Sequence, residues 1–255
     1  MTSFLSPSVQ SVTSEAAGYP AANALDLMHP RRRWRTTATG TQHLILMLNA
    51  SPPLSGVYLG ACNFSSITIA ASSVADFSSD VVTIVPTSVV PLIRRRTGAQ
   101  GYFPTQAASN RMYLRVTPSG ATEGGASFYE CGQVIVVDQV VPELAQELSH
   151  PMEWTRRQGT SALEFSSHAL VQVAEAGPFL EVNVGNPVWR RRRTPPYDLT
   201  TDPAEHLWSC LGTSVLLHEN RADASAAYFG HLVEDPTVLY DVATFSAGLR
   251  LREYA

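Results

Sequence analysis

Short runs of aliphatic, β-branched and aromatic residues, bounded by glycine, proline, serine or asparagine, recur along this chain of 255 residues. In the first half they are QHLILML (42–48), GVYLGA (56–61), SITIAAS (66–72), VVTIVP (81–86), RMYLRV (111–116) and SFYECGQVIVV (127–137). Such runs are typical of β-strands, and their close spacing is typical of sandwiches and barrels. The first half is therefore predicted to be all-β, with TPSGATEGGA (117–126) as a flexible connection.

The second half begins after a polar segment that contains two prolines, residues 141–151. Its predicted strands are ALVQVAE (169–175), FLEVNVG (179–185), SVLLHE (214–219), AAYFGHLV (226–233) and the terminal run 238–254. The alternation in FLEVNV and LRLREY is typical of half-buried antiparallel strands. We predict an all-β protein of two β-sandwich, jelly-roll-like domains, residues 1–140 and 141–255.

One helix is predicted, in the second domain. Asp202 can cap it, Pro203 suits its first position, and Gly212 ends it. The helix is expected near residues 203–211, where it would cover one open end of the second sandwich.

The composition excludes several classes of protein. With 44% apolar and 16% charged residues the chain is globular, and a net charge of −4 excludes a generally basic nucleic-acid coat. The N-terminus lacks the pattern of a secretory signal, and no run of about 18 apolar residues predicts a membrane span. The cysteines, Cys62, Cys131 and Cys210, form no metal-binding pattern, so each is predicted to be a small buried apolar residue. No metal or cofactor is expected.

The 18 cationic side chains are all arginine, and ten of them stand in three runs. The runs are Arg31, Arg32 and Arg33; Arg94, Arg95 and Arg96; and Arg190, Arg191, Arg192 and Arg193. Three interpretations remain open: solvated loop ends, contacts with nucleic acid, and a subunit interface. We favour the interface, because arginine is enriched there and pairs in bidentate fashion with carboxylates.

Two smaller groups of residues have alternative interpretations. The four tryptophans could stack on sugars, but a buried aromatic residue closing a sandwich end is favoured for each. Asn23 and Asp26 supply too few oxygens for calcium unless backbone carbonyls contribute.

Searches for catalytic motifs find none. His218 and Glu219 begin an HExxH pattern, but Ala222 stands where the second histidine would be. Neither a GxSxG elbow nor a phosphate-binding GxxxxGK[ST] loop occurs. The chain is therefore not expected to be an enzyme.

An ordered series of segments resembles a known family. YPAANALD…WRTT (19–37) followed by QHLILML resembles the first turn and strand of discoidin-like (galactose-binding-like) jelly rolls. More closely, it resembles tail proteins of long-tailed bacteriophages and prophages. LSGVYLGACNFSSITIAAS (54–72), RMYLRVTP (111–118) and YECGQVIVVD (129–138) continue the resemblance over about residues 19–140, and WTRRQGTS (154–161) resembles the opening of those proteins' second half.

The resemblance implies a structural virion protein, made in the host cytoplasm, at the distal end of the phage tail (tip or baseplate). It would form a homo-oligomeric ring that contacts the tail tube, hub and tape-measure proteins, without nucleic acid or membrane as partner. The alternative is a carbohydrate-binding module that attaches to the host cell surface through Trp34, Tyr102 and Phe103.

Overall fold

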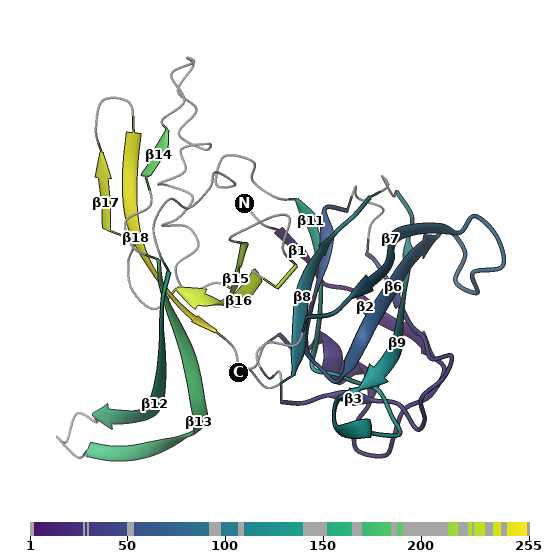
Figure 1. Cartoon of the computed structure of the whole chain (residues 1–255), viewed down its shortest axis with the longest axis horizontal. Coiled ribbons are helices and arrows are strands. Elements are labelled where there is room, and N and C mark those ends of the chain that lie inside the picture. The colour runs from purple at the N-terminus through teal and green to yellow at the C-terminus, as the bar shows by residue number, and fades with distance from the viewer. Residues whose placement is uncertain are drawn as a thin grey trace. The chain divides into compact units, whose positions relative to one another are not determined.

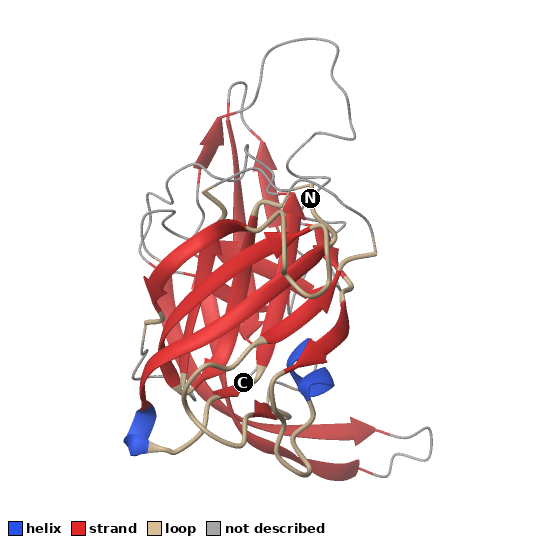
Figure 2. Cartoon of the chain, turned by 90° about the vertical axis from the view of Figure 1, so that its right-hand side faces the viewer, coloured by secondary structure: helices blue, strands red, loops and turns tan. Residues whose placement is uncertain are grey.

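The computed structural model describes residues 3–27, 29, 31–49, 54–91, 98–106, 110–139, 152–164, 170–184, 188–190, 214–218, 224–225, 227–232, 237–240 and 244–253. The chain divides into two compact units. The first comprises Met1–Val141 and His218–Ala227, and the second comprises Pro142–Leu217 and Tyr228–Ala255. Regular structure in the described residues is almost entirely antiparallel strand, with two short 3-10 turns (Figure 2), so the predicted all-β class is confirmed.

The first unit is a sandwich of two antiparallel sheets (Figure 1). The five-stranded sheet has the order β2-β4-β9-β6-β7, with β2 at Ser8–Val12, β4 at Leu44–Met47, β9 at Tyr113–Thr122, β6 at Phe64–Ser72 and β7 at Val82–Val89. The four-stranded sheet has the order β1-β11-β5-β8, with β1 at Ser3–Leu5, β11 at Gln133–Gln139, β5 at Gly56–Cys62 and β8 at Ala99–Pro104. A short ladder joins β3 (Trp34–Arg35) to β10 (Glu130–Cys131). The turns are η1 (Ala21–Leu25) and η2 (Glu123–Gly125).

The core lies between these two sheets, and the period-two pattern of the sequence places it there. In β4, Leu44 and Leu46 are buried while Ile45 and Met47 are partly exposed, as expected for a strand that covers a core with one face. Ile67 and Ile69 of β6 lie in the same apolar cluster. Each fully buried aliphatic side chain of this kind contributes about 1.5–3 kcal/mol to the free energy of folding.

Seven strands of the first unit lie in or overlap the predicted runs, but the flexible connection predicted at 117–126 is wrong in its larger part. Strand β9 continues to Thr122 and pairs with β6 through Thr117, Pro118 and Ser119. Pro118 can stand in a strand where its missing N–H is not required, and Gly120 adopts a positive φ of 81° close to the side chain of Ser65. Strands β1, β2, β3 and β8, which are short or lack alternation, were not predicted.

The second unit contains one seven-stranded antiparallel sheet among its described residues, with the order β12-β13-β18-β16-β15 and with β14 and β17 also paired to β18. Its strands are β12 (Met152–Glu164), β13 (Leu170–Val184), β14 (Val188–Arg190), β15 (Ser214–His218), β16 (Ala227–Leu232), β17 (Thr237–Tyr240) and β18 (Thr244–Glu253). The two strands predicted at 169–175 and 179–185 are one, β13, which forms a long ribbon with β12 (Figure 1). The helix predicted near 203–211 and the boundary segment 141–151 lie outside the described residues. Among the described residues, no helix is long and apolar enough to cross a membrane.

Candidate binding surface around Glu130

Strand β3 is held at the edge of the first unit by Trp34. Its side chain is 1% exposed and lies in the apolar core, and its indole Nε1–H donates a hydrogen bond to the carbonyl of Ser14 (3.2 Å). Because neighbouring residues of a strand point to opposite faces, burial of Trp34 turns Arg35 away from the core. The ladder with β10 then places Arg35 opposite Glu130.

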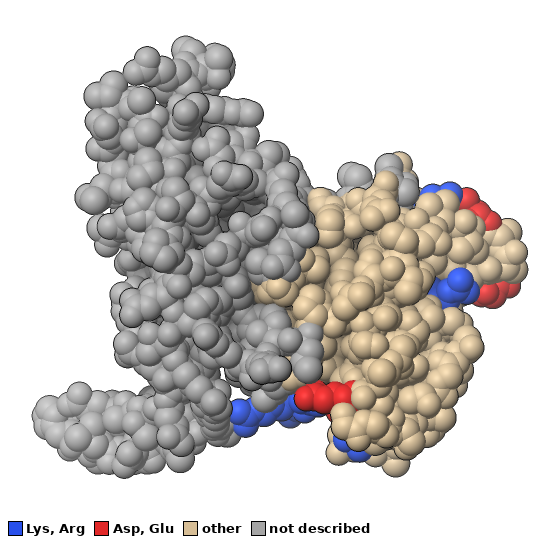
Figure 3. Space-filling model, viewed as in Figure 1, with Lys and Arg blue, Asp and Glu red and all other residues tan. Residues whose placement is uncertain are grey.

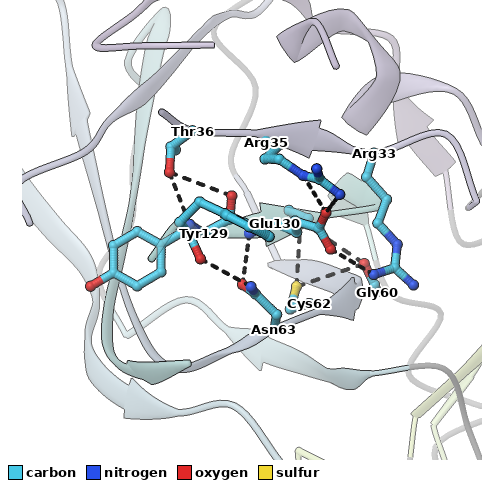
Figure 4. A network of polar contacts seen from close by, with 10 residues as sticks. Arg33, Arg35, Thr36, Gly60, Cys62, Asn63, Tyr129 and Glu130 are labelled. Atoms are coloured by element: carbon cyan, nitrogen blue, oxygen red, sulfur yellow. Dashed lines mark hydrogen bonds and ion pairs between the residues drawn. The ribbon is translucent and has the colours of Figure 1, made fainter. Parts of the chain in front are cut away.

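Two arginines converge on the Glu130 carboxylate (Figure 4). Arg33 donates through Nη1 to Oε2 (2.8 Å), and Arg35 donates through Nε to Oε1 (2.5 Å) and also contacts Oε1 through Nη2. The side chain of Glu130 is 8% exposed, so its charge would be costly without these partners. The two guanidinium groups satisfy both carboxylate oxygens.

Backbone hydrogen bonds fix the strand that carries this carboxylate. The side-chain Oδ1 of Asn63 accepts from the N–H of Glu130 (2.7 Å), and Nδ2 of Asn63 donates to the carbonyl of Phe128 (3.0 Å). Thr36 Oγ1 accepts from the N–H of Tyr129 (2.9 Å), so β3 and β10 are joined through side chains as well as through their ladder (Figure 4).

The guanidinium of Arg35 lies between two aromatic rings. Its Cζ is 3.8 Å from the ring centre of Tyr19 and 4.4 Å from that of Phe128. Both rings are half-buried, so part of each remains at the surface. We call the set Tyr19, Arg33, Arg35, Phe128 and Glu130 the Glu130 cluster.

A second polar group lies beside the cluster, on η1 and the turn after it. Asn23 Nδ2 donates to the carbonyl of Arg33 (3.0 Å), while the Asp26 carboxylate contacts His29 Nδ1 (3.0 Å) and the exposed Arg32 (3.7 Å). Asn23 and Asp26, considered above for calcium, thus make protein contacts. Within the described part of the chain, no group of three or more histidine, cysteine or acidic side chains is arranged to hold a metal ion.

The predicted glycan contacts do not form an exposed platform. Trp34, Tyr102 and Phe103 are 1%, 4% and 3% exposed, so protein atoms cover their rings. Phe103 packs in the core, while Tyr102, on the other face of β8, lies over Gly56 of β5. A sugar cannot stack on these rings as they stand.

The predicted interface arginines lie in different surroundings. Arg31 and Arg32 are exposed on the turn before β3, while Arg33 is drawn to Glu130. Arg190 ends β14. Arg94, Arg95, Arg96, Arg191, Arg192 and Arg193 lie outside the described residues, so the interface role of the three runs stays a prediction.

On the face shown in Figure 3, acidic and basic side chains of the first unit lie beside each other at a few places on an otherwise uncharged surface. Close arginine–carboxylate contacts of the first unit join Arg33 and Arg35 to Glu130, and Arg111 to Asp80. The described surface therefore provides mixed-charge clusters, which suit a polar ligand better than the phosphate backbone of a nucleic acid.

Sequence reasoning missed Tyr19, Arg35, Phe128 and Glu130 as members of one surface. Arg35 follows the buried Trp34, and this alternation was the one available signal that its side chain faces outward. Its carboxylate partner stands 95 residues away and is set by the pairing of β3 with β10, which the sequence pattern does not reveal.

The first unit is thus a two-layer antiparallel β-sandwich with a polar, aromatic-lined cluster at the edge formed by β3 and β10. No family model matches the chain, and no curated protein matches it. Among solved structures it is similar to module CBM32-3 of a family 31 glycoside hydrolase from Clostridium perfringens, with 15% identity, 52% of this chain and 92% of that chain covered, and a TM-score of 0.43.

Two further solved structures are similar to about the same share of this chain. Chitosan-binding module 1 of a chitosanase/glucanase from Paenibacillus sp. IK-5 is 24% identical, with 52% and 95% of the two chains covered and a TM-score of 0.40. The N-terminal domain of the single-strand break repair protein XRCC1 is 16% identical, with 54% and 99% covered and a TM-score of 0.43. At these values the likeness assigns no ligand to this chain.

Proposed function

We propose that this chain is a non-catalytic attachment protein whose first unit binds a glycan through the Glu130 cluster. The observation that carries the proposal is the Arg35 guanidinium stacked between Tyr19 and Phe128 at a half-exposed position. The parts of the Tyr19 and Phe128 rings that remain at the surface can pack against the C–H face of a sugar ring, and the polar groups beside them can hydrogen-bond to its hydroxyls.

The donor inventory of the cluster favours a ligand rich in acceptor oxygens. Each guanidinium carries five N–H donors, and the Glu130 carboxylate occupies only some of those on Arg33 and Arg35. Glu130 holds both groups in fixed positions, which lowers the entropy cost of binding a ligand. Hydroxyl, carboxylate and carbonyl oxygens of a polysaccharide are suitable acceptors.

Replacement of Tyr19 by alanine tests this proposal. The parent and Tyr19→Ala are applied to an array of neutral and acidic polysaccharides, with Tyr113→Ala as the matched control. Tyr113 is also half-buried, but it begins β9. The end of β9 near the cluster is the one with Gly120, whose carbonyl accepts a hydrogen bond from Tyr129, the neighbour of Glu130.

We expect Tyr19→Ala to weaken binding to the preferred glycan by about tenfold, the equivalent of about 1.4 kcal/mol, and Tyr113→Ala to leave it unchanged. Melting curves of both variants show that they are folded. An array without any bound glycan, or equal binding by Tyr19→Ala and the parent, contradicts the proposal.

The second candidate, a tail component of a long-tailed phage at its tip or baseplate, draws on the family resemblance of residues 19–140. The exposed Arg31 and Arg32, one of which has only a 3.7 Å contact with Asp26, favour a protein contact there. A tail protein can also carry an attachment module, so the two candidates are compatible. In this setting the chain would form a homo-oligomeric ring with tail tube, hub and tape-measure proteins.

The double replacement of Arg31 and Arg32 by alanine tests the tail candidate and leaves Arg33 in place on Glu130. Light scattering of the parent is expected to give an oligomer and that of the variant a smaller species. A monomeric parent that fails to join tail assemblies counts against this candidate. Tight duplex-DNA binding that falls steeply with salt, and that the variant loses, would assign the two arginines to phosphate instead.

A further inference from the structure

Cys62 and Cys131 lie opposite each other on adjacent antiparallel segments. The N–H of Asn63 donates to the carbonyl of Glu130 (3.2 Å), and the N–H of Gly132 donates to the carbonyl of Gly60 (3.0 Å), on either side of the two cysteines. The second bond reaches Gly60 and not Ala61, whose φ is positive (53°), so the pairing beside the cysteines is irregular. The two bonds hold the segments side by side at the cysteines.

The two thiols already touch. Their Sγ atoms are 3.4 Å apart, and both side chains are 1% exposed, within the core of the sandwich. Cys131 Sγ donates to the carbonyl of Gln133 (3.3 Å), and both sulfur atoms lie near the carbonyl of Gly60 (3.7 and 3.9 Å). A disulfide requires these two Sγ atoms to approach from 3.4 Å to about 2.0 Å.

We propose that Cys62 and Cys131 are a disulfide site, closed when the protein folds in, or is transferred to, an oxidising environment. The oxidant is a small disulfide such as oxidised glutathione. One cysteine thiolate attacks it and releases one glutathione thiol, and the second cysteine thiolate then displaces the other. The protein loses two protons and two electrons, and the oxidant gains them and leaves as two thiols.

The bond would secure the strand that carries the Glu130 cluster. Cys131 follows Glu130 in β10, and Cys62 precedes Asn63, whose side chain holds the Glu130 N–H. The link closes a loop between residues 69 apart and thus reduces the entropy of the unfolded chain. This proposal is independent of the glycan proposal, because it concerns the strands and not the ligand.

Burial makes the closure slow in the folded protein. It raises the pKa of the Cys62 thiol well above its ordinary value, and the hydrogen bond to Cys131 adds to this rise. Since the thiolate is the attacking species, exchange depends on transient opening or takes place during folding.

The test uses the full chain with Cys210→Ser, so that only the two cysteines in question remain. Refolding in oxidised and reduced glutathione is expected to give a species lighter by two hydrogen atoms, with no free thiol in denaturant. Cleavage after arginine should release fragments 36–94 and 116–156 as one linked species that separates on reduction. The oxidised protein should melt roughly 5–15 °C above the reduced one.

The control variants are Cys62→Ala and Cys131→Ala, whose melting temperatures should not respond to the oxidant. If either variant fails to fold, the linked fragments from the Cys210→Ser protein still decide the question. Two free thiols after refolding in the oxidant overturn the proposal, and so does a disulfide that lowers the melting temperature.

Discussion

Two carboxylates of the first unit, Glu130 and Asp80, make close contacts with arginine in different surroundings. Glu130 binds Arg33 and Arg35 with its side chain 8% exposed, whereas Asp80 binds Arg111 with its side chain 45% exposed. Arg111 donates to both Asp80 oxygens, through Nε to Oδ2 (3.1 Å) and through Nη2 to Oδ1 (2.5 Å). By distance alone the two contacts are equivalent.

The two contacts differ in the burial of the carboxylate, and this decides how much each contributes to stability. A charge near the surface is screened by water and salt, and an exposed pair contributes little to stability. A carboxylate in the interior depends on its partners, because without them it keeps the desolvation penalty and loses the compensation. Glu130 therefore fixes the position of β3, while Asp80 orders a loop in which Phe77 and Asp80 already adopt positive φ angles of 55° and 53°.

Replacement of Glu130 by glutamine is expected to have the largest effect. Glutamine keeps the shape but leaves two guanidinium groups without a counter-charge, and breaking a buried pair in this way costs about 3–5 kcal/mol. Urea denaturation measures the loss, with Glu123→Gln, an exposed carboxylate of η2, as the control. A loss for Glu130→Gln no larger than that of the control would remove the distinction between the two contacts.

The two arginines of the cluster should differ in how much stability their replacement costs. Arg35→Met loses the bonds to Glu130 and the stacking on Tyr19 and Phe128, whereas Arg33→Met loses only its contact with the carboxylate. Stacking on a partly exposed ring contributes about 0.5–1 kcal/mol per ring, so Arg35→Met should be the more destabilising variant by about 1–2 kcal/mol. Denaturation midpoints of the two variants give this difference directly, and equal midpoints argue against a role for the rings.

Asp80→Asn should change stability far less than Glu130→Gln. The hydrogen bond from Arg111 is the main cause that lowers the pKa of Asp80, with Ser73 contributing next. Since the folded pKa lies below the unfolded value, the stabilisation is present above the unfolded pKa and is lost as the pH falls through the folded pKa. Denaturation at neutral pH should show a small difference that shrinks as salt is added; a large, salt-insensitive one would make the Asp80 contact equivalent to that of Glu130.

The strands could be predicted where one face of a sheet is buried, because Leu44 and Leu46 or Leu114 and Val116 then alternate with polar or exposed neighbours. Alternation fails in β8, where Tyr102 and Phe103 are buried on opposite faces. Both residues were predicted as glycan contacts, but both side chains are buried. Ala224, which is distant in the sequence, also contacts β8, since its carbonyl accepts a hydrogen bond from the N–H of Tyr102 (3.0 Å).

The binding cluster could not be predicted as a set. Its members come from the turn before η1, from β3 and from β10, and only the folded topology brings them together. The sequence does place Trp34 correctly in the core, and the side of the strand on which Arg35 stands follows from it. The partner of Arg35 depends on the register Glu130↔Arg35, which no local pattern encodes.

The smallest expected effect is a pH dependence of stability that comes from His43. This residue is less buried than Glu130 and less exposed than Asp80. Its Nδ1 lies 3.0 Å from Thr117 Oγ1, and desolvation, followed by the charge of Arg115, lowers its pKa below 6.5. The unfolded chain therefore binds a proton at this histidine more readily than the folded one does. The stabilisation is complete above about pH 6.5 and is lost as the pH falls from there to the folded pKa.

His43→Gln removes this titration and leaves every other group in place. The stability of the parent should thus fall more steeply than that of the variant on acidification below pH 6.5, as measured by urea denaturation at a series of pH values. Parallel curves would show that His43 titrates alike in both states, and a parent that gains stability relative to the variant would reverse the sign.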